Sequence, residues 1–294
     1  MESKQLTALT QDLQQITDML LLNGTLTECP GLVHGKMGIA VFFFHYAQFT
    51  NNMLFANYAI DLIGEIQEQL HVNSPADYEN GLAGIGVGID YMVRNEFLIA
   101  EDDICKEFDS RMVRAVMYDP WQDFSLYDGL SGYGRYWISR LRFNDSSLQA
   151  RKCILRIVEW IEERLDEVPS NEQFEVYCFL HDLHHLSGFD KGIGNAFHLL
   201  EQCRLEWDLQ SADMNRSFSR LGDSTTGNII RKYLHNRYFN ERLQTEIEVD
   251  MKQLRDLDLE KPPAKMGLLS GYAGEGLSRL TALNQTNIFW MYLL

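Results

Sequence analysis

Residues 267–277 read GLLSGYAGEGL, and the spacing of their glycines recurs five times earlier in the chain. Nineteen of the 21 glycines lie in these six clusters, so glycine marks fixed positions of a repeat. The earlier clusters begin at Gly31, Gly81, Gly129, Gly188 and, in a weaker form, Gly222. Self-similarity with a period of about 20 to 50 residues predicts stacked copies of one structural unit.

Each glycine cluster runs directly into an apolar segment of helical length. Residues 39–49 are apolar nearly all round, whereas residues 5–22 place their apolar side chains three and four apart, as an amphipathic helix does. The first and last clusters start 236 residues apart over five intervals, or about 47 residues per repeat, which accommodates two helices of about 15 residues with short loops. We therefore predict helical hairpins, each with one amphipathic helix and one glycine-led apolar helix.

Two all-α architectures fit such hairpins, namely an open solenoid and a closed ring. The glycines favour the ring, because helices that converge on one axis need residues without Cβ where backbones crowd together and where an entry turn takes positive φ. We predict an α/α toroid of about six helical hairpins, with glycine-led inner helices and amphipathic outer helices. Residues 1–294 would form this toroid as a single domain.

The composition restricts the classes of partner. No stretch approaches the roughly 18 uncharged apolar residues of a transmembrane helix, so we expect no membrane insertion. The first residues lack the basic start and apolar centre of a secretory signal, and the five cysteines lack CxxC spacing; both features predict a cytoplasmic protein. A net charge of −16 disfavours nucleic acid and suits either solubility or a basic peptide partner.

The ordered set of glycine clusters resembles the lanthionine synthetase C-like (LanC-like) family over essentially the whole chain. The resemblance lies in repeated GLxxGxxG entries, the third cluster GLSGYG at Gly129, and the ending GLLSGYAGEGLSRL with its aromatic and aliphatic tail at residues 288–294. It implies an α/α toroid. In catalytic members it also implies a zinc enzyme that adds a Cys thiol to dehydroalanine or dehydrobutyrine.

The sequence departs from the zinc-ligand motifs of that family, which are Trp-Cys-x-Gly and Cys-His-Gly in late glycine clusters. Gly222 and Asp223 stand where the Cys-His pair would be, and the last cluster offers Leu269 and Ser270. We therefore expect a divergent, metal-free member that needs no cofactor. It would bind a peptide substrate or a peptide-modifying enzyme in the modification of ribosomal, lantibiotic-type peptides.

Two further family positions are altered. The His that precedes a glycine in the middle cluster falls near Lys191, and the Asp that precedes GLSG falls at Ser125, while Asp128 stands next to that glycine instead.

Cys178, His181 and His185 have the one metal-like spacing in the chain. On a helix they share a face, and sulfur with imidazole suits zinc. The alternative function is therefore an active zinc-dependent lanthionine cyclase with a relocated metal. The same residues also fit a helix with a buried cysteine and surface histidines, which we expect to be an outer helix because it precedes its glycine cluster.

Candidate pocket residues lie in the turns that open the glycine-led helices. His34 is at the mouth of the first such helix, and a toroid would gather equivalent turns into one basin. The other candidates are Asp128, Lys191, Asp223, Tyr272 and Glu275. We predict that these six residues line a pocket.

The sequence matches the motifs of other enzyme and ligand-binding classes less well. Glycine-rich turns can bind anions through free N–H groups, but no cluster reads GxxxxGK[ST], none follows a clear strand, and GLSGYG is not GxSxG. A minor alternative is a carbohydrate-active toroid, which needs two carboxylates about 5 to 9.5 Å apart. Asp128, Asp223 and Glu275 are the candidates for that role.

Overall fold

The computed structural model describes residues 3–99, 105–118, 120, 123–186, 189, 198, 221, 224–239, 243–252, 254, 265–283 and 287–294. Within these ranges all named secondary structure is helical, and the one isolated bridge joins Lys265 and Gly271. The all-α prediction is therefore confirmed for this part of the chain. No helix in it combines the length and the apolar character needed to cross a membrane.

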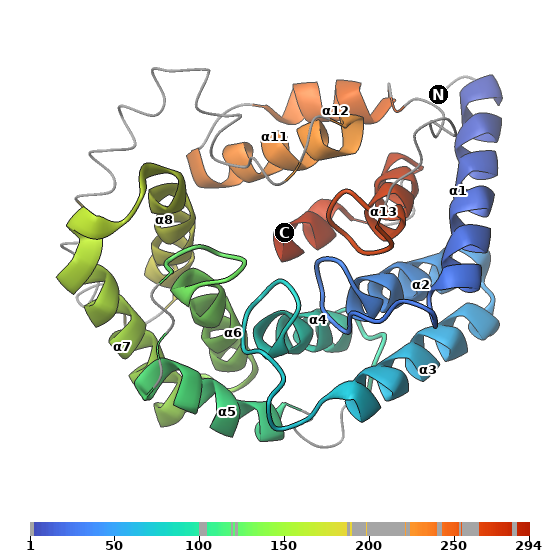
Figure 1. The fold of residues 1–294 in the computed structure, drawn as a ribbon. Helices are drawn as coiled ribbons and strands as arrows, with labels where there is room; N and C mark the ends of the chain where they lie inside the picture. Colours follow the sequence, from blue (N-terminus) through green and yellow to red (C-terminus); the bar gives the residue numbers. More distant parts are fainter. Residues whose placement is uncertain are drawn as a thin grey trace. The chain divides into compact units, whose positions relative to one another are not determined.

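The chain divides into two compact units, the first made of Met1–Ser74 with Arg220–Leu294 and the second of Pro75–Ser219. Figure 1 shows the helices of each. The first unit contains α1 (Ser3–Asn23), α2 (Lys36–Thr50), α3 (Met53–Gln69), α11 (Thr225–Phe239), α12 (Gln244–Lys252), α13 (Tyr272–Ala282) and the 3₁₀ helix η3 (Ile288–Leu293). The second contains α4 (Leu82–Arg94), α5 (Lys106–Met117), α6 (Leu130–Phe143), α7 (Leu148–Arg164), the 3₁₀ helix η1 (Leu165–Glu167) and α8 (Ser170–His184). The single domain over residues 1–294 stays a prediction.

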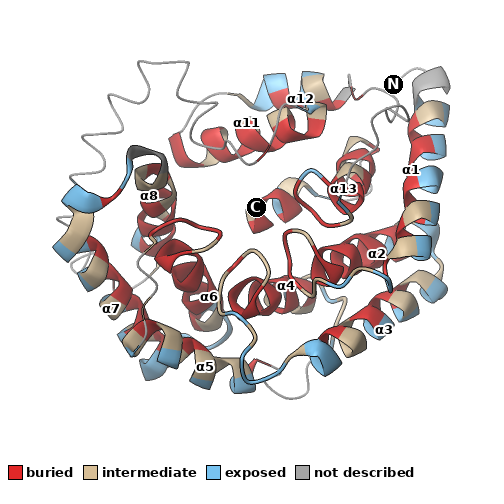
Figure 2. Ribbon diagram, viewed as in Figure 1, coloured by how far each residue is buried: buried red, intermediate tan, exposed pale blue. Residues whose placement is uncertain are grey.

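Helices that follow each other in the chain pack together in pairs. In the first unit α2 packs on α3 and α11 on α12, and in the second α4 packs on α5 and α6 on α7. Every residue of α2 from 36 to 47 is buried, whereas α3 buries a stripe made of Ala56, Ala59, Leu62 and Ile66. Figure 2 shows the same contrast between α6 and α7. A helix without a polar face must be covered on all sides, so the glycine-led helices form the core of each unit.

Four glycine-led helices begin with the same turn. Their N-cap residues are Gly35, Gly81, Gly129 and Gly271, all with φ between −110° and −124° and extended backbone. None has a side-chain cap. Instead the first helical N–H donates to the carbonyl oxygen seven residues earlier, in the pairs Lys36–Cys29 (2.9 Å), Leu82–Pro75 (3.0 Å), Leu130–Asp123 (2.9 Å) and Tyr272–Lys265 (3.1 Å). We call these four segments the entry turns, residues 29–35, 75–81, 123–129 and 265–271.

The prediction that the N-cap glycines need positive φ is wrong, because any residue can adopt the extended backbone found there. Space is the actual constraint. A Cβ atom at Gly35, Gly81 or Gly129 would overlap the carbonyl oxygen six residues earlier in the same turn. Glycine is thus required because the turn folds back against its own helix start.

A second set of glycines forms notches between neighbouring helices. Gly86 of α4 faces the ring of Tyr136 of α6, and a Cβ atom there would lie 2.5 Å from Tyr136 Cε2. Gly134 faces Phe179 of α8 in the same way, and in the first unit Gly276 of α13 faces Phe42 of α2. An aromatic side chain of one helix therefore fills the notch left by a glycine of a neighbouring helix.

Helix α8 corrects the predicted assignment of the fourth repeat. We expect an amphipathic outer helix there, but residues 176–180, 182 and 183 are all buried and Phe179 occupies the notch at Gly134. It follows Pro169 and has no N-cap glycine. Helix α8 is therefore not an exposed amphipathic helix, and the Gly188 cluster itself lies outside the described residues apart from Phe189.

Candidate functional site

The first and last entry turns lie side by side in the first unit. Leu269 N donates to Val33 O over 3.0 Å, and α13 packs against α2. A Cβ atom at Gly267 would lie 2.5 Å from His34 Cα, so this glycine allows the two turns to touch. The structure therefore brings His34 close to the turn that precedes Tyr272.

His34 contacts a residue that the sequence argument does not single out. Its Nε2 lies 2.8 Å from Lys265 Nζ, with Lys265 exposed and His34 partly buried. Because an ammonium group only donates, Nε2 must accept, which places the imidazole proton on Nδ1. Lys265 lies six residues before Gly271, as Cys29 does before Gly35, so aligning the turns in register could have revealed it.

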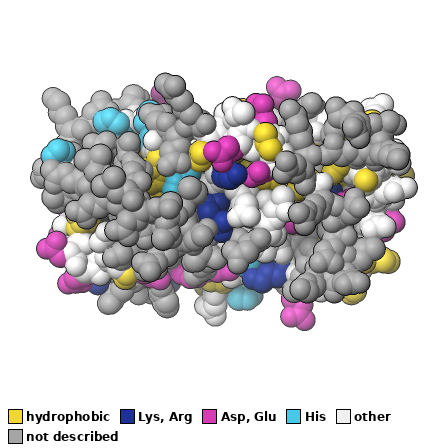
Figure 3. Space-filling model, turned by 90° about the horizontal axis from the view of Figure 1, so that it is seen from above, with side chains coloured by type: hydrophobic (Ala, Val, Ile, Leu, Met, Phe, Trp, Pro, Cys, Tyr) yellow, Lys and Arg dark blue, Asp and Glu magenta, His cyan; other side chains and the backbone are white. Residues whose placement is uncertain are grey.

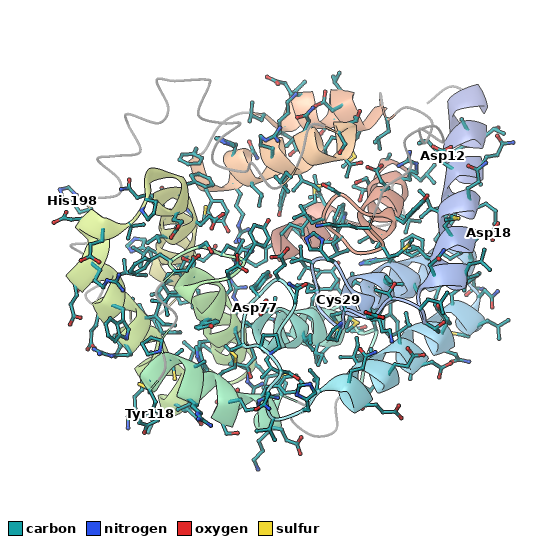
Figure 4. The ribbon with its side chains drawn as sticks, viewed as in Figure 1. Asp12, Asp18, Cys29, Asp77, Tyr118 and His198 are labelled. Atoms are coloured by element: carbon teal, nitrogen blue, oxygen red, sulfur yellow. The ribbon has the colours of Figure 1, made fainter. Side chains whose placement is uncertain are left out.

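Glu275 is a structural residue more than a pocket residue. Its Oε2 accepts from Thr226 Oγ1 (2.9 Å) and from Arg279 Nη1 (2.7 Å). Arg279 also donates through Nε to Asp12 Oδ2 (3.0 Å), and its side chain is only 2% exposed. Asp12 lies on the side of α1 that faces α13 in Figure 4. The network joins α1, α11 and α13, so we assign Glu275 to the core of the first unit.

Tyr272 and Ser270 complete the last entry turn. Tyr272 is 4% exposed, and its burial raises the pKa of the phenol. Ser270 is exposed and has φ of 51°, the left-handed region that few residues other than glycine and asparagine adopt. Its Oγ donates to Leu221 O over 3.3 Å. The Ser270 hydroxyl is therefore bonded to the backbone of residue 221.

Asp128 lies in the second unit, against the entry turn of α4. Tyr127 O accepts from the backbone N–H groups of Tyr78 (2.9 Å) and Glu79 (3.0 Å), which joins the two turns. The pKa of Asp77 is raised, mainly by burial and further by the carboxylates of Asp128 and Glu79. Asp77 and Asp128 thus form a carboxylate pair that only the pairing of the turns reveals.

The entry turn of α6 is held by two carboxylates of α8. Glu172 Oε2 accepts from Phe124 N over 3.1 Å, and Glu175 Oε2 accepts from Leu126 N over 2.5 Å. Burial raises the pKa of Glu172 even though the bond to Phe124 opposes that shift. Helix α8 therefore fixes the backbone next to Asp128.

The entry turns do not leave helix N–H groups open for an anion. In α13 the N–H groups of Tyr272, Ala273 and Gly274 all donate to carbonyl oxygens of the turn, at 3.1, 3.0 and 3.3 Å. In α2 those of Lys36 and Met37 do the same. Anion binding through free amides, possible from the sequence, is therefore disfavoured at these two turns.

Two of the six pocket candidates, Lys191 and Asp223, lie outside the described residues. The other four belong to different units: His34, Tyr272 and Glu275 to the first, Asp128 to the second. The common pocket therefore stays a prediction.

The alternative metal ligands all lie on or beside α8. Cys178 is buried, His181 is partly buried and His185 is exposed, with the two imidazole rings 4.5 Å apart and His185 Nδ1 2.8 Å from His181 O. Among the described residues no group of three or more His, Cys, Asp or Glu is placed so that it could hold a metal ion. Cys178, His181 and His185 thus form no such group.

Comparison of the sequence with known protein-family models and with curated proteins finds no match to either.

Proposed function

We propose that this chain is a divergent LanC-like protein that binds a peptide segment in the modification of ribosomal, lantibiotic-type peptides, without a zinc cyclase centre. The observation that carries the proposal is the shared geometry of the four entry turns, each with an N-cap glycine and a bond from the first helical N–H to a carbonyl seven residues earlier. This geometry matches the repeated glycine entries on which the resemblance rests. The partner is a peptide or a peptide-modifying enzyme, and the location is cytoplasmic.

The proposed fold is an α/α toroid with α2, α4, α6, α8, α11 and α13 as inner helices. It is supported by the aromatic-on-glycine contacts, which link successive inner helices within the second unit and link α13 to α2 within the first. A repeat whose last copy packs on its first needs no capping unit, which favours closure over a solenoid.

The absence of the zinc motifs supports a binding role over the cyclase. A cyclase needs a metal-bound thiolate as nucleophile and a neighbouring acid or base. Ser270 stands at a ligand position and is bonded to backbone, and no carboxylate–imidazole–thiol group is formed among the described residues. The entry turns then remain as the part of the chain that can recognise a peptide.

Peptide binding can be tested with a display library of random peptides about 15 residues long and the immobilised protein. Enriched peptides would be remeasured by fluorescence anisotropy against wild type and His34→Ala. We expect at least a tenfold loss of affinity, or about 1.4 kcal/mol, for His34→Ala and no change for the exposed His71→Ala in the same unit. No enriched peptide, or affinities indifferent to changes in every entry turn, would refute the proposal.

A second candidate function is favoured by the Asp77–Asp128 pair. Asp77, whose pKa is raised mainly by burial, and the neighbouring Asp128 would supply the two carboxyl groups that glycoside hydrolysis uses. A glycan array with the purified protein tests it, because a carbohydrate-active protein should retain a glycan and lose it on Asp128→Asn. An array without any retained glycan disposes of this candidate.

A further inference from the structure

The Lys265–His34 contact joins two entry turns that are 231 residues apart in the sequence. Lys265 precedes α13 and His34 precedes α2, and the turns are also bonded through Leu269 N and Val33 O. The position of the Lys265 amine is therefore set by backbone contacts as well as by the imidazole. An amine held in this way loses less conformational entropy when it binds a ligand.

The charge of Lys265 is not neutralised by this contact. An ammonium group has three N–H donors, and His34, a neutral acceptor in this bond, uses one of them. The described part of the chain contains no ion pair of Lys265 with a carboxylate, whereas Lys36 pairs with one carboxylate and Lys232 and Arg279 with two each. Two donors and a full positive charge thus remain at an exposed position.

The surroundings favour a negative ligand. His34 shortly precedes α2 and Lys265 belongs to the entry turn of α13, and each helix N-terminus carries a partial positive charge of roughly half a unit. Their N–H groups are occupied by the entry turns, so the ligand would be bound by side chains and only assisted by the helix dipoles. Figure 3 shows Lys and Arg side chains reaching the surface beside acidic ones, although the net charge of the chain is −16.

We propose that Lys265, positioned by His34, binds a carboxylate of the peptide ligand. The free donors of the ammonium group can make charge-assisted hydrogen bonds to a carboxylate oxygen. The carboxylate could come from the peptide C-terminus or from an Asp or Glu side chain. This inference rests on the proposed peptide-binding function, and it assigns to Lys265 the specificity for an acidic group.

Small carboxylates test the site without requiring the natural peptide. The full chain, labelled with ¹⁵N in histidine, would be titrated with N-acetylglycine, which mimics a C-terminus, and with N-acetylaspartate α-methylamide, which mimics a side chain. Neutral N-acetylglycinamide is the matched control. We expect a saturable shift of the His34 imidazole resonances with at least one carboxylate and none with the amide, and the stronger carboxylate identifies the source.

Lys265→Gln should abolish the shift, while Lys152→Gln, at an exposed lysine of α7, should leave it unchanged. A second variant, His34→Gln, is read through the ¹⁵N-labelled Lys265 amine and should weaken binding without removing it. Circular dichroism checks that each variant is folded. An equal shift with the amide, or a shift that persists in Lys265→Gln, overturns the inference. Peptide binding by the display assay with no response to small carboxylates would refute only this site, whereas an empty display screen would refute the proposed function.

Discussion

At the level of single residues, the position of each glycine is explained by what its missing Cβ atom would touch. Gly132 of α6 is a clear case, because a Cβ atom there would overlap the carbonyl oxygen of Leu126 in the entry turn. A backbone carbonyl oxygen cannot relieve the overlap by changing rotamer, as a flexible side chain can. Gly64, in the middle of α3, has no neighbouring atom within 4 Å of the place that a Cβ atom would take, and so has no comparable constraint.

Gly132→Ala and Gly64→Ala should therefore change stability in opposite directions. Overpacking against Leu126 should cost about 1–3 kcal/mol, more than the gain in helix propensity. Gly64→Ala should gain about 0.5–1 kcal/mol, because alanine loses less backbone entropy in a helix. Urea unfolding measures both as shifts of the midpoint at constant slope. Equal effects of the two substitutions would contradict the steric explanation.

Two buried histidines should make the protein acid-sensitive. Burial lowers the pKa of His45 to about 4, and burial together with the charge of Arg231 does the same for His235. The unfolded chain titrates near 6.5, so it binds more protons than the native chain below that pH. Their stabilising contribution is complete above pH 6.5 and falls as the pH approaches 4, by about 3 kcal/mol for each residue.

His45→Gln should flatten this dependence. Between pH 6.5 and 4.5 the unfolding free energy of the variant should fall less steeply than that of wild type, by up to about 1.4 kcal/mol per pH unit. Denaturant unfolding at several pH values gives the difference between the two slopes. His71→Gln, at an exposed position, serves as the control. Parallel slopes for wild type and His45→Gln would mean that His45 can accept a proton in the folded state.

At the level of helices, the buried arginine of α13 links α13 to α1. Asp12→Ala would leave Arg279 with an incomplete set of partners in the core, and breaking a buried pair costs about 3–5 kcal/mol. Asp18→Ala, on the exposed side of the same helix in Figure 4, should change stability by no more than about 0.5 kcal/mol. Thermal unfolding of the two variants makes the comparison. Similar melting temperatures would show that the ion pair contributes nothing.

The packing of α8 on α6 includes one close contact, that of the Phe179 ring with Gly134. A double-mutant cycle tests it. Gly134→Ala alone should be destabilising because the new methyl group overlaps the ring, whereas in the Phe179→Ala background it should be neutral or stabilising by up to about 1 kcal/mol. Strictly additive effects would show that the two residues do not meet.

The helices were predictable because their signals are local. Apolar spacing identified α1, and glycine clusters identified the starts of α2, α4, α6 and α13. Helix α4 ends at Arg94, shortly before Glu96, which takes a φ of 60°. The role of α8 was not predictable from the glycine rule, because a proline and not a glycine precedes it.

At the level of the whole molecule, the site was less predictable than the fold because it depends on which turns meet. His34 was identified from its place before a glycine, but Lys265 and Asp77 become relevant only through the backbone contacts Leu269–Val33 and Tyr127–Tyr78. Glu275 looked like a pocket residue in the sequence, and only the fold shows that Thr226 and Arg279 occupy its carboxylate. Contacts between distant segments carry no local signal in a single sequence.

The net charge of −16 is a property of the whole chain that affects which partners the protein attracts. It would draw a basic peptide toward the protein over a distance limited by screening, about 8 Å at physiological salt. The exposed Lys265 would then act only at contact range, on an acidic group within such a peptide. Selectivity would come from combining long-range attraction for positive charge with one local site for a carboxylate.

The proposal of a LanC-like protein without a zinc centre is tested most directly by the metal content of the protein purified in the absence of chelators. Plasma mass spectrometry measures this content. We predict far less than one zinc per chain, unchanged by Cys178→Ala. About one tightly bound zinc per chain, lost on Cys178→Ala, would contradict the metal-free proposal and favour the cyclase alternative.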